Sequence, residues 1–125
     1  MRALFLLPLI LSAPVTAAVQ EGDHARTVEV RLSSFDFAPS KIRLRAGEPI
    51  VLHLVNTGNG GHNFAAPQFF AAARGVSGPI RSGRIEVAGH QSVDVRATPA
   101  RGTYRLKCTH TLHSTLGMTG SIVVE

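Results

Sequence analysis

Apolar and polar residues alternate in short runs along most of this chain. Val28, Val30 and Leu32, for example, are separated by Glu29 and Arg31, and an apolar residue at every second position is typical of a strand with one buried face. Glycine and proline residues lie between these runs and predict turns. This pattern predicts an all-β fold, a single Greek-key β-sandwich. We expect about eight strands, over residues 27–33, 41–45, 50–55, 62–66, 84–87, 92–96, 102–107 and 120–124.

Two segments depart from this alternation. Residues 68–74 contain two phenylalanines followed by three alanines, a composition that favours one short helix, and Gly75 is expected to end it. We interpret Phe69 and Phe70 as core cover beneath this helix. Residues 35–39 end in a proline and are interpreted as a bend.

The first residues have the organisation of a secretory signal peptide. Arg2 is followed by an apolar run over residues 3–11 and by small residues over 15–18, the order of a basic region, an apolar core and a cleavage site. The apolar run is too short to span a bilayer. We expect residues 1–18 to be removed, and residues 19–125 to form one domain that is exported to the periplasm and has no membrane-spanning segment.

The chain is mildly basic. It contains 13 Lys and Arg against 8 Asp and Glu, a net charge of +5. Arg2 is the only charged residue of the leader, so the mature domain carries +4. The basic residues are scattered along the sequence, which argues against a nucleic-acid-binding arm. Two interpretations stay open: electrostatic steering toward an acidic partner, or a charged surface that keeps the domain soluble.

The only cysteine, Cys108, lies near the C-terminal end of the chain. A single cysteine cannot form an internal disulfide, and a free thiol outside the cytoplasm is open to oxidation unless it is buried or binds a metal. His113 and Met118 follow on the same predicted loop, and His62 follows a glycine-rich turn far away in the sequence. A thiolate, two imidazoles and a thioether form the ligand set of blue copper, which favours one-electron transfer.

These motifs resemble those of the cupredoxin superfamily, the plastocyanin- and azurin-like type 1 blue copper proteins. The resemblance covers nearly the whole mature chain and is most specific in Gly-His-Asn-Phe at residues 61–64 and in Cys108-x4-His113-x4-Met118. It implies one copper ion in a type 1 site, with His62, Cys108, His113 and Met118 as its ligands. The methionine would be an axial ligand, and such a contact is weak and long.

The resemblance also implies contacts outside the ligand set. Asn63 would form a hydrogen bond to the cysteine loop near Thr109, and bonds of this kind orient ligands and tune their metal. The Gly61 carbonyl would approach the copper. Residues 109–112 lack the proline that many family members have there, and they include His110. Whether His110 is a bystander or modifies the site stays open.

Several of these residues also have simpler interpretations. Taken alone, Cys108 would be a buried and inert small side chain, and Met118 would pack in the core. His53 alternates with leucines in a strand and is interpreted as a surface or hydrogen-bonded core histidine. His24 and His90 are expected in solvent, with weak binding of a second copper as the alternative for His24.

The leading hypothesis is a periplasmic carrier that passes single electrons between redox proteins, such as cytochromes with acidic surfaces. His113 would be the exit edge, and Leu112, Leu116 and Phe64 would form an apolar docking rim around it. Transient redox encounters need little contact area, and nothing in the sequence demands more than a monomer.

An alternative function is copper tolerance, storage or delivery, to which the additional histidines at 24, 90 and 110 would contribute. An enzyme such as a multicopper oxidase or nitrite reductase is not expected. Such enzymes need further copper sites and an open coordination position, and this chain has neither the length nor the clustered histidines.

Overall fold

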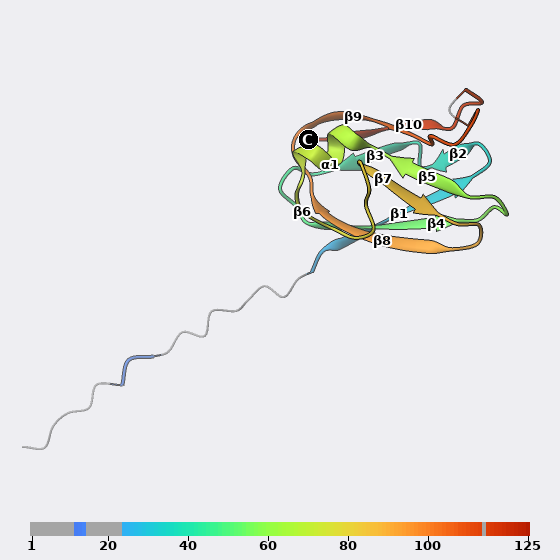
Figure 1. Cartoon of the computed structure of the whole chain (residues 1–125). Helices are drawn as coiled ribbons and strands as arrows, with labels where there is room; N and C mark the ends of the chain where they lie inside the picture. The colour runs from blue at the N-terminus through green and yellow to red at the C-terminus, as the bar shows by residue number, and fades with distance from the viewer. Residues whose placement is uncertain (1–11, 15–23, 114) are drawn as a thin grey trace, which may run out of the picture.

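The computed structural model describes residues 12–14, 24–113 and 115–125, and the account below concerns these residues. They form two five-stranded sheets and one short helix (Figure 1). The elements, in chain order, are β1 (Arg26–Ser33), β2 (Asp36–Ala38), β3 (Lys41–Leu44), β4 (Ile50–Asn56), β5 (His62–Ala65), α1 (Pro67–Ala72), β6 (Arg74–Ser77), β7 (Arg84–Val87), β8 (Ser92–Thr98), β9 (Gly102–Lys107) and β10 (Thr119–Val124).

Each sheet mixes parallel and antiparallel neighbours. The first sheet has the order β2-β1-β4-β8-β6, in which β1 and β4 are parallel. The second has the order β3-β10-β9-β5-β7, in which β3 and β10 are parallel. The chain passes repeatedly from one sheet to the other, so residues far apart in sequence become neighbours. The predicted all-β sandwich is confirmed.

The core lies between the two sheets and follows from the alternation of the strands. In β4, Ile50, Leu52 and Leu54 are at most 1 % exposed, whereas the residues between them are partly exposed. The helix α1 closes one side of the core with Phe69 and Phe70, whose rings meet edge to face with centroids 5.1 Å apart. The prediction that these two phenylalanines cover the core is confirmed.

The structure has two strands, β2 and β6, in addition to the approximately eight that the sequence predicted. The segment interpreted as a bend contains β2, which pairs with β1 in a short hairpin and buries only Phe37. All four residues of β6 are exposed, so this edge strand has no apolar alternation to reveal it. The helix begins at Pro67 rather than at residue 68, because proline suits the first helical turn, and it ends at Ala72, before Gly75.

Two further predictions from the sequence concern the N-terminal leader and membrane-spanning segments. The predicted leader, residues 1–18, lies outside the described residues apart from 12–14. Among the residues that are described, no helix has the length and apolar character needed to cross a membrane.

The loop between β9 and β10 and the turn between β4 and β5 lie at the same end of the sandwich, and the C-terminus lies at the other (Figure 1). Three of the four predicted ligands lie in the loop between β9 and β10, and the fourth, His62, directly follows the turn between β4 and β5.

Candidate metal centre

Cys108 is the first residue after β9, and its side chain is fully buried. It continues the inward-facing row of the strand, two residues beyond Leu106. Its Sγ atom accepts a hydrogen bond from the Asn63 backbone N–H at 3.4 Å, and its own N–H donates to the Met118 carbonyl at 3.1 Å. The thiol is therefore held between the start of β5 and the start of β10.

His62 is the first residue of β5 and is 1 % exposed. The side chain of Asn56 ties the preceding turn: its Nδ2 donates to the Gly60 and Val87 carbonyls at 2.8 and 3.0 Å, and its Oδ1 accepts from the Gly58 N–H at 2.9 Å. The His62 Nε2 atom is buried and has no hydrogen-bond partner among the described residues. The other ring nitrogen, Nδ1, points toward His113.

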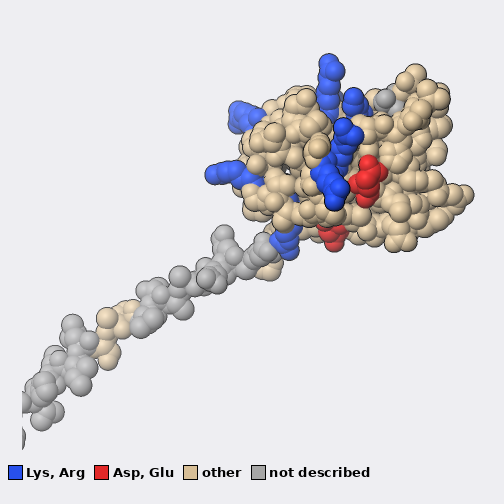
Figure 2. Space-filling model, in the orientation of Figure 1, with Lys and Arg blue, Asp and Glu red and all other residues tan. Residues whose placement is uncertain are grey.

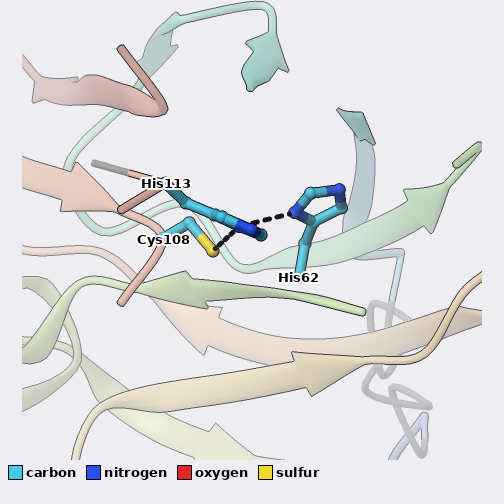
Figure 3. Close-up of side chains that lie close together, drawn as sticks. All are labelled: His62, Cys108 and His113. Atoms are coloured by element: carbon cyan, nitrogen blue, oxygen red, sulfur yellow. Dashed lines mark hydrogen bonds between the residues drawn. The ribbon is translucent and has the colours of Figure 1, made fainter. Parts of the chain in front are cut away.

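His113 lies on the loop between β9 and β10 and is half-buried. Its Nδ1 atom is 3.3 Å from the Cys108 Sγ atom and 3.2 Å from the His62 Nδ1 atom (Figure 3). All three donor atoms lie within 4.8 Å of one another. Bonds from a first-row metal to nitrogen and sulfur of about 2.0–2.3 Å would separate donors by roughly 3–4 Å. Two imidazoles and one thiol therefore fit a single ion, and their softness suits copper.

The electrostatics of His62 favour its neutral form. Burial is the main cause that lowers the pKa of His62, and the neighbouring His113 and His110 lower it further when they are positively charged. A neutral imidazole keeps a lone pair on one nitrogen, which is the form that binds a metal.

Met118, the fourth predicted ligand, is fully buried and directly precedes β10. Its N–H donates to the His113 carbonyl at 2.9 Å, and its carbonyl accepts from Cys108. These two bonds fold the loop back on itself and bring the methionine beside the cysteine. Gly117 has φ +99°, a conformation that side chains rarely adopt, and no atom lies near its would-be Cβ. Glycine is therefore favoured at this position by the backbone conformation, and not by a neighbouring atom that a side chain would meet.

The hydrogen bond implied between Asn63 and the cysteine loop is confirmed. The Asn63 Oδ1 atom accepts from the Thr109 N–H at 2.8 Å, and its Nδ2 donates to Thr109 Oγ1 at 2.7 Å. The same Nδ2 donates to Glu86 Oε1 at 2.9 Å. Glu86 was not predicted from the sequence, because its place beside Asn63 depends on the register of β7 against β5.

The remaining histidines lie in other surroundings. His53 is partly exposed and its ring bonds to Asp94 at 2.6 Å, which agrees with its interpretation as a hydrogen-bonded histidine. His90 is exposed and bonds to Asn59 at 2.6 Å, and His24 is also exposed. His110 lies within the site region: its ring centroid is 5.5 Å from that of His113.

One predicted part of the docking rim is wrong. Phe64 is fully buried, because it shares the inward side of β5 with His62. Leu112 and Leu116 are 64 % and 56 % exposed, as predicted. Phe35, just before β2, provides the aromatic side chain instead: it is 38 % exposed, and its ring meets that of His113 edge to face at 5.1 Å. The sequence revealed neither residue's place, because all four residues of β5 are buried and show no alternation, and Phe35 meets His113 only in the folded chain.

The chain belongs to the family of cupredoxin-like domains, whose family description matches residues 3–124. Together with the cluster of His62, Cys108 and His113, this membership identifies the cofactor as one copper ion in a type 1 site. None of the curated proteins compared with the chain matches it.

Three solved structures illustrate the likeness. Auracyanin B is 27 % identical over 81 % of this chain and 89 % of its own, with a TM-score of 0.61. An auracyanin from the photosynthetic bacterium Roseiflexus castenholzii is 20 % identical over 81 % and 98 %, with a TM-score of 0.63. The McoA multicopper oxidase from the hyperthermophile Aquifex aeolicus is 16 % identical over 82 % of this chain and 30 % of its own, with a TM-score of 0.65. The last two show the fold alone.

Proposed function

We propose that this protein is an exported, periplasmic type 1 copper protein that passes single electrons between redox partners. His62, Cys108 and His113 would be its main copper ligands, and Met118 would be a fourth, weaker one. The observation that carries the proposal is the convergence of two imidazole nitrogens and one thiol sulfur within 4.8 Å. When bound, the copper would supply a change between Cu(I) and Cu(II) without making or breaking a covalent bond.

The fold contributes rigidity to this chemistry. Cys108 and Met118 are joined by a backbone hydrogen bond and flank a loop whose two ends enter β9 and β10. His62 is fixed by the strand β5 and by the turn that Asn56 ties. Ligands held in this way move little between two oxidation states, which lowers the reorganisation needed for each transfer.

We propose that electrons leave or enter at the His113 edge. Of the histidines in the cluster, His113 is the more exposed, and Phe35, Leu112 and Leu116 surround this end with apolar surface. A small apolar rim of this kind supports brief contacts with a redox partner rather than a permanent complex.

The outer face of the second sheet supports a partner with an acidic surface. Cross-strand register aligns Lys41 and Arg105 on either side of Ser121, and Arg84 and Lys107 on either side of Ala65. These four basic side chains are exposed and form no ion pair among the described residues. Figure 2 shows more basic than acidic side chains on the visible face. Charges that are scattered in sequence are thus gathered by the strands, which favours steering toward acidic proteins.

Copper tolerance, storage or delivery is the alternative function. It would draw on the additional histidines, but the ring of His90 bonds to Asn59 and that of His110 bonds to Glu86. An oxidase is not proposed, because the part of the chain that the structure describes holds one group of three metal-binding side chains and oxidases need further copper sites.

The test is the visible and EPR spectrum of the mature protein with one equivalent of Cu(II), compared with Cys108→Ser. We expect an intense charge-transfer band and narrow copper hyperfine splitting in the wild type, and the loss of both in the variant, because a serine oxygen replaces the soft thiolate. An ordinary Cu(II) spectrum that the substitution leaves unchanged would sink the proposal. Reversible voltammetry of the copper would then favour the carrier, and irreversible behaviour with tight binding would favour storage.

A further inference from the structure

A row of polar side chains crosses three neighbouring segments beside the metal centre. The register of β5 and β7 places Asn63 opposite Glu86. The register of β5 and β9 places Ala65 opposite Lys107, and two residues further along it Thr109 faces Asn63. A carboxylate, an amide and a hydroxyl therefore lie side by side, in the order Glu86, Asn63, Thr109.

Every hydrogen-bonding atom of the Asn63 side chain has a partner in this row. Its Oδ1 accepts from the Thr109 N–H, and its Nδ2 donates to Thr109 Oγ1 and to Glu86 Oε1. Asn63 is 1 % exposed, so loss of the carboxylate would leave a buried N–H without an acceptor, which is costly. Glu86 therefore supplies one of the three hydrogen bonds that orient the amide, and Thr109 supplies the other two.

The second oxygen of the same carboxylate reaches the cysteine loop. Glu86 Oε2 lies 2.8 Å from His110 Nε2. The His110 ring packs against Gly61, where a Cβ atom would lie 3.5 Å from His110 Cε1. Its centroid is 5.5 Å from that of His113. One carboxylate on β7 therefore connects the start of β5 with the loop that carries His113.

We propose that Glu86 is a positioning residue of the metal centre, which holds Asn63 with one carboxylate oxygen and His110 with the other. Through Asn63, whose backbone N–H donates to Cys108 Sγ, it stabilises the surroundings of the thiolate. Through His110 it holds the loop closed against Gly61. The proposal rests on the proposed function, because the loop that Glu86 holds carries the proposed ligands. It assigns His110 the role of a modifier of the site rather than a bystander.

The experiment compares Glu86→Ala with Glu125→Ala, a control that removes another exposed carboxylate at the opposite end of the sandwich. Amide hydrogen exchange is first measured on the apoproteins. We expect exchange of the Thr109 N–H to be at least about tenfold faster in Glu86→Ala, because its acceptor Asn63 is no longer oriented. Amides in β1 and β4 serve as an internal reference, and we expect them to be unchanged.

The copper-loaded proteins provide the second readout. Loss of a direct hydrogen-bond partner of a metal ligand commonly costs about 10–100-fold in metal affinity. Glu86 lies one hydrogen bond further from the ligands, so we expect a smaller loss of affinity, seen as faster loss of copper to a chelator and a shifted charge-transfer band in Glu86→Ala. Glu86→Gln keeps an amide oxygen in the position of Oε1, so we expect it to restore the protection of Thr109 to within about twofold.

Equal exchange of the Thr109 amide in Glu86→Ala and Glu125→Ala would overturn the proposed role of Glu86. Equal copper spectra and equal copper loss in these two variants would do the same. If the wild type lacked a type 1 spectrum, the proposed function would fail, whereas Thr109 exchange in the apoproteins would still decide the role of Glu86.

Discussion

The two histidines of the metal centre are held in different ways. His62 stands on a strand, is 1 % exposed, and follows a turn that Asn56 fastens with three hydrogen bonds. His113 stands on a loop, is half-buried, and contacts the exposed ring of Phe35. One imidazole is therefore part of the sheet, and the other is part of the surface.

This difference suggests a separate role for each of the two histidines. In the proposed function, the buried and strand-borne His62 would fix the position of the ion, because any displacement would disturb the pairing of β5 with β7. The partly exposed and loop-borne His113 would bring the ion within reach of a partner. The loop is nevertheless restrained, because the Met118 N–H donates to the His113 carbonyl and the Met118 carbonyl accepts from Cys108. The comparison shows that the metal centre is open to solvent on the His113 side and enclosed on the His62 side.

Replacement of each histidine by glycine tests this difference with the largest expected effect. We expect both His62→Gly and His113→Gly to lose Cu(II) affinity by more than the roughly 10–100-fold that an outer partner costs. Added imidazole should restore the charge-transfer band in His113→Gly, because the space left behind opens to solvent. It should fail to do so in His62→Gly, where the space is enclosed. Optical titration with imidazole measures both.

The apoproteins of these two variants provide the control. We expect His62→Gly to lower the free energy of unfolding by about 2–4 kcal/mol, since it removes a buried side chain from a strand, and His113→Gly by less than about 1 kcal/mol. Urea denaturation measures this difference. Equal rescue by imidazole in both variants would contradict the division between a buried and an accessible ligand.

The same contrast explains how much of the molecule could be predicted from the sequence. Strands with one face in the core, such as β1 and β3, show alternation because burial imposes it. The strand β6 shows none, because all its residues are exposed. The residues Cys108, His113 and Met118 lie close together in the sequence, so their grouping was visible there.

Contacts between segments distant in sequence were harder to predict. Glu86 reaches Asn63 through strand register, and Phe35 reaches His113 from the turn that connects β1 and β2. Neither register nor loop conformation is written in local composition. Phe64 was wrongly predicted to lie on the surface for the same reason, because the position of β5 within the sheet decides that the Phe64 side chain points into the core.

Substitution of Phe35 tests the exposed side of the comparison. We expect Phe35→Ala to keep the type 1 spectrum and to slow electron exchange with a redox partner several-fold, because the apolar rim shrinks and His113 loses an edge-to-face neighbour worth about 0.5–1.5 kcal/mol. The matched control is Phe37→Ala, two residues away but buried against Phe64. It should cost about 3–5 kcal/mol in unfolding free energy while the folded protein keeps its exchange rate. Stopped-flow kinetics and urea denaturation separate the two effects.

The pH dependence of the apoprotein tests the buried side. Burial, reinforced by His113 and His110, lowers the pKa of His62 below 6.5 in the folded protein. The unfolded chain then binds a proton at a higher pH than the folded chain does, so the stability that neutral His62 contributes is present above pH 6.5 and is lost as the pH falls through the lowered pKa. We expect the urea midpoint of the apoprotein to fall in that window, and His62→Gln to reduce the fall. In His113→Gln the loss should be smaller and should end at a higher pH, because removal of His113 lets the pKa of His62 in the folded protein rise toward that of the unfolded chain. An equal fall of the urea midpoint with pH in the wild type, His62→Gln and His113→Gln would show that His62 has the same pKa in the folded and unfolded chains. That result would contradict the distinction between a buried and an exposed histidine.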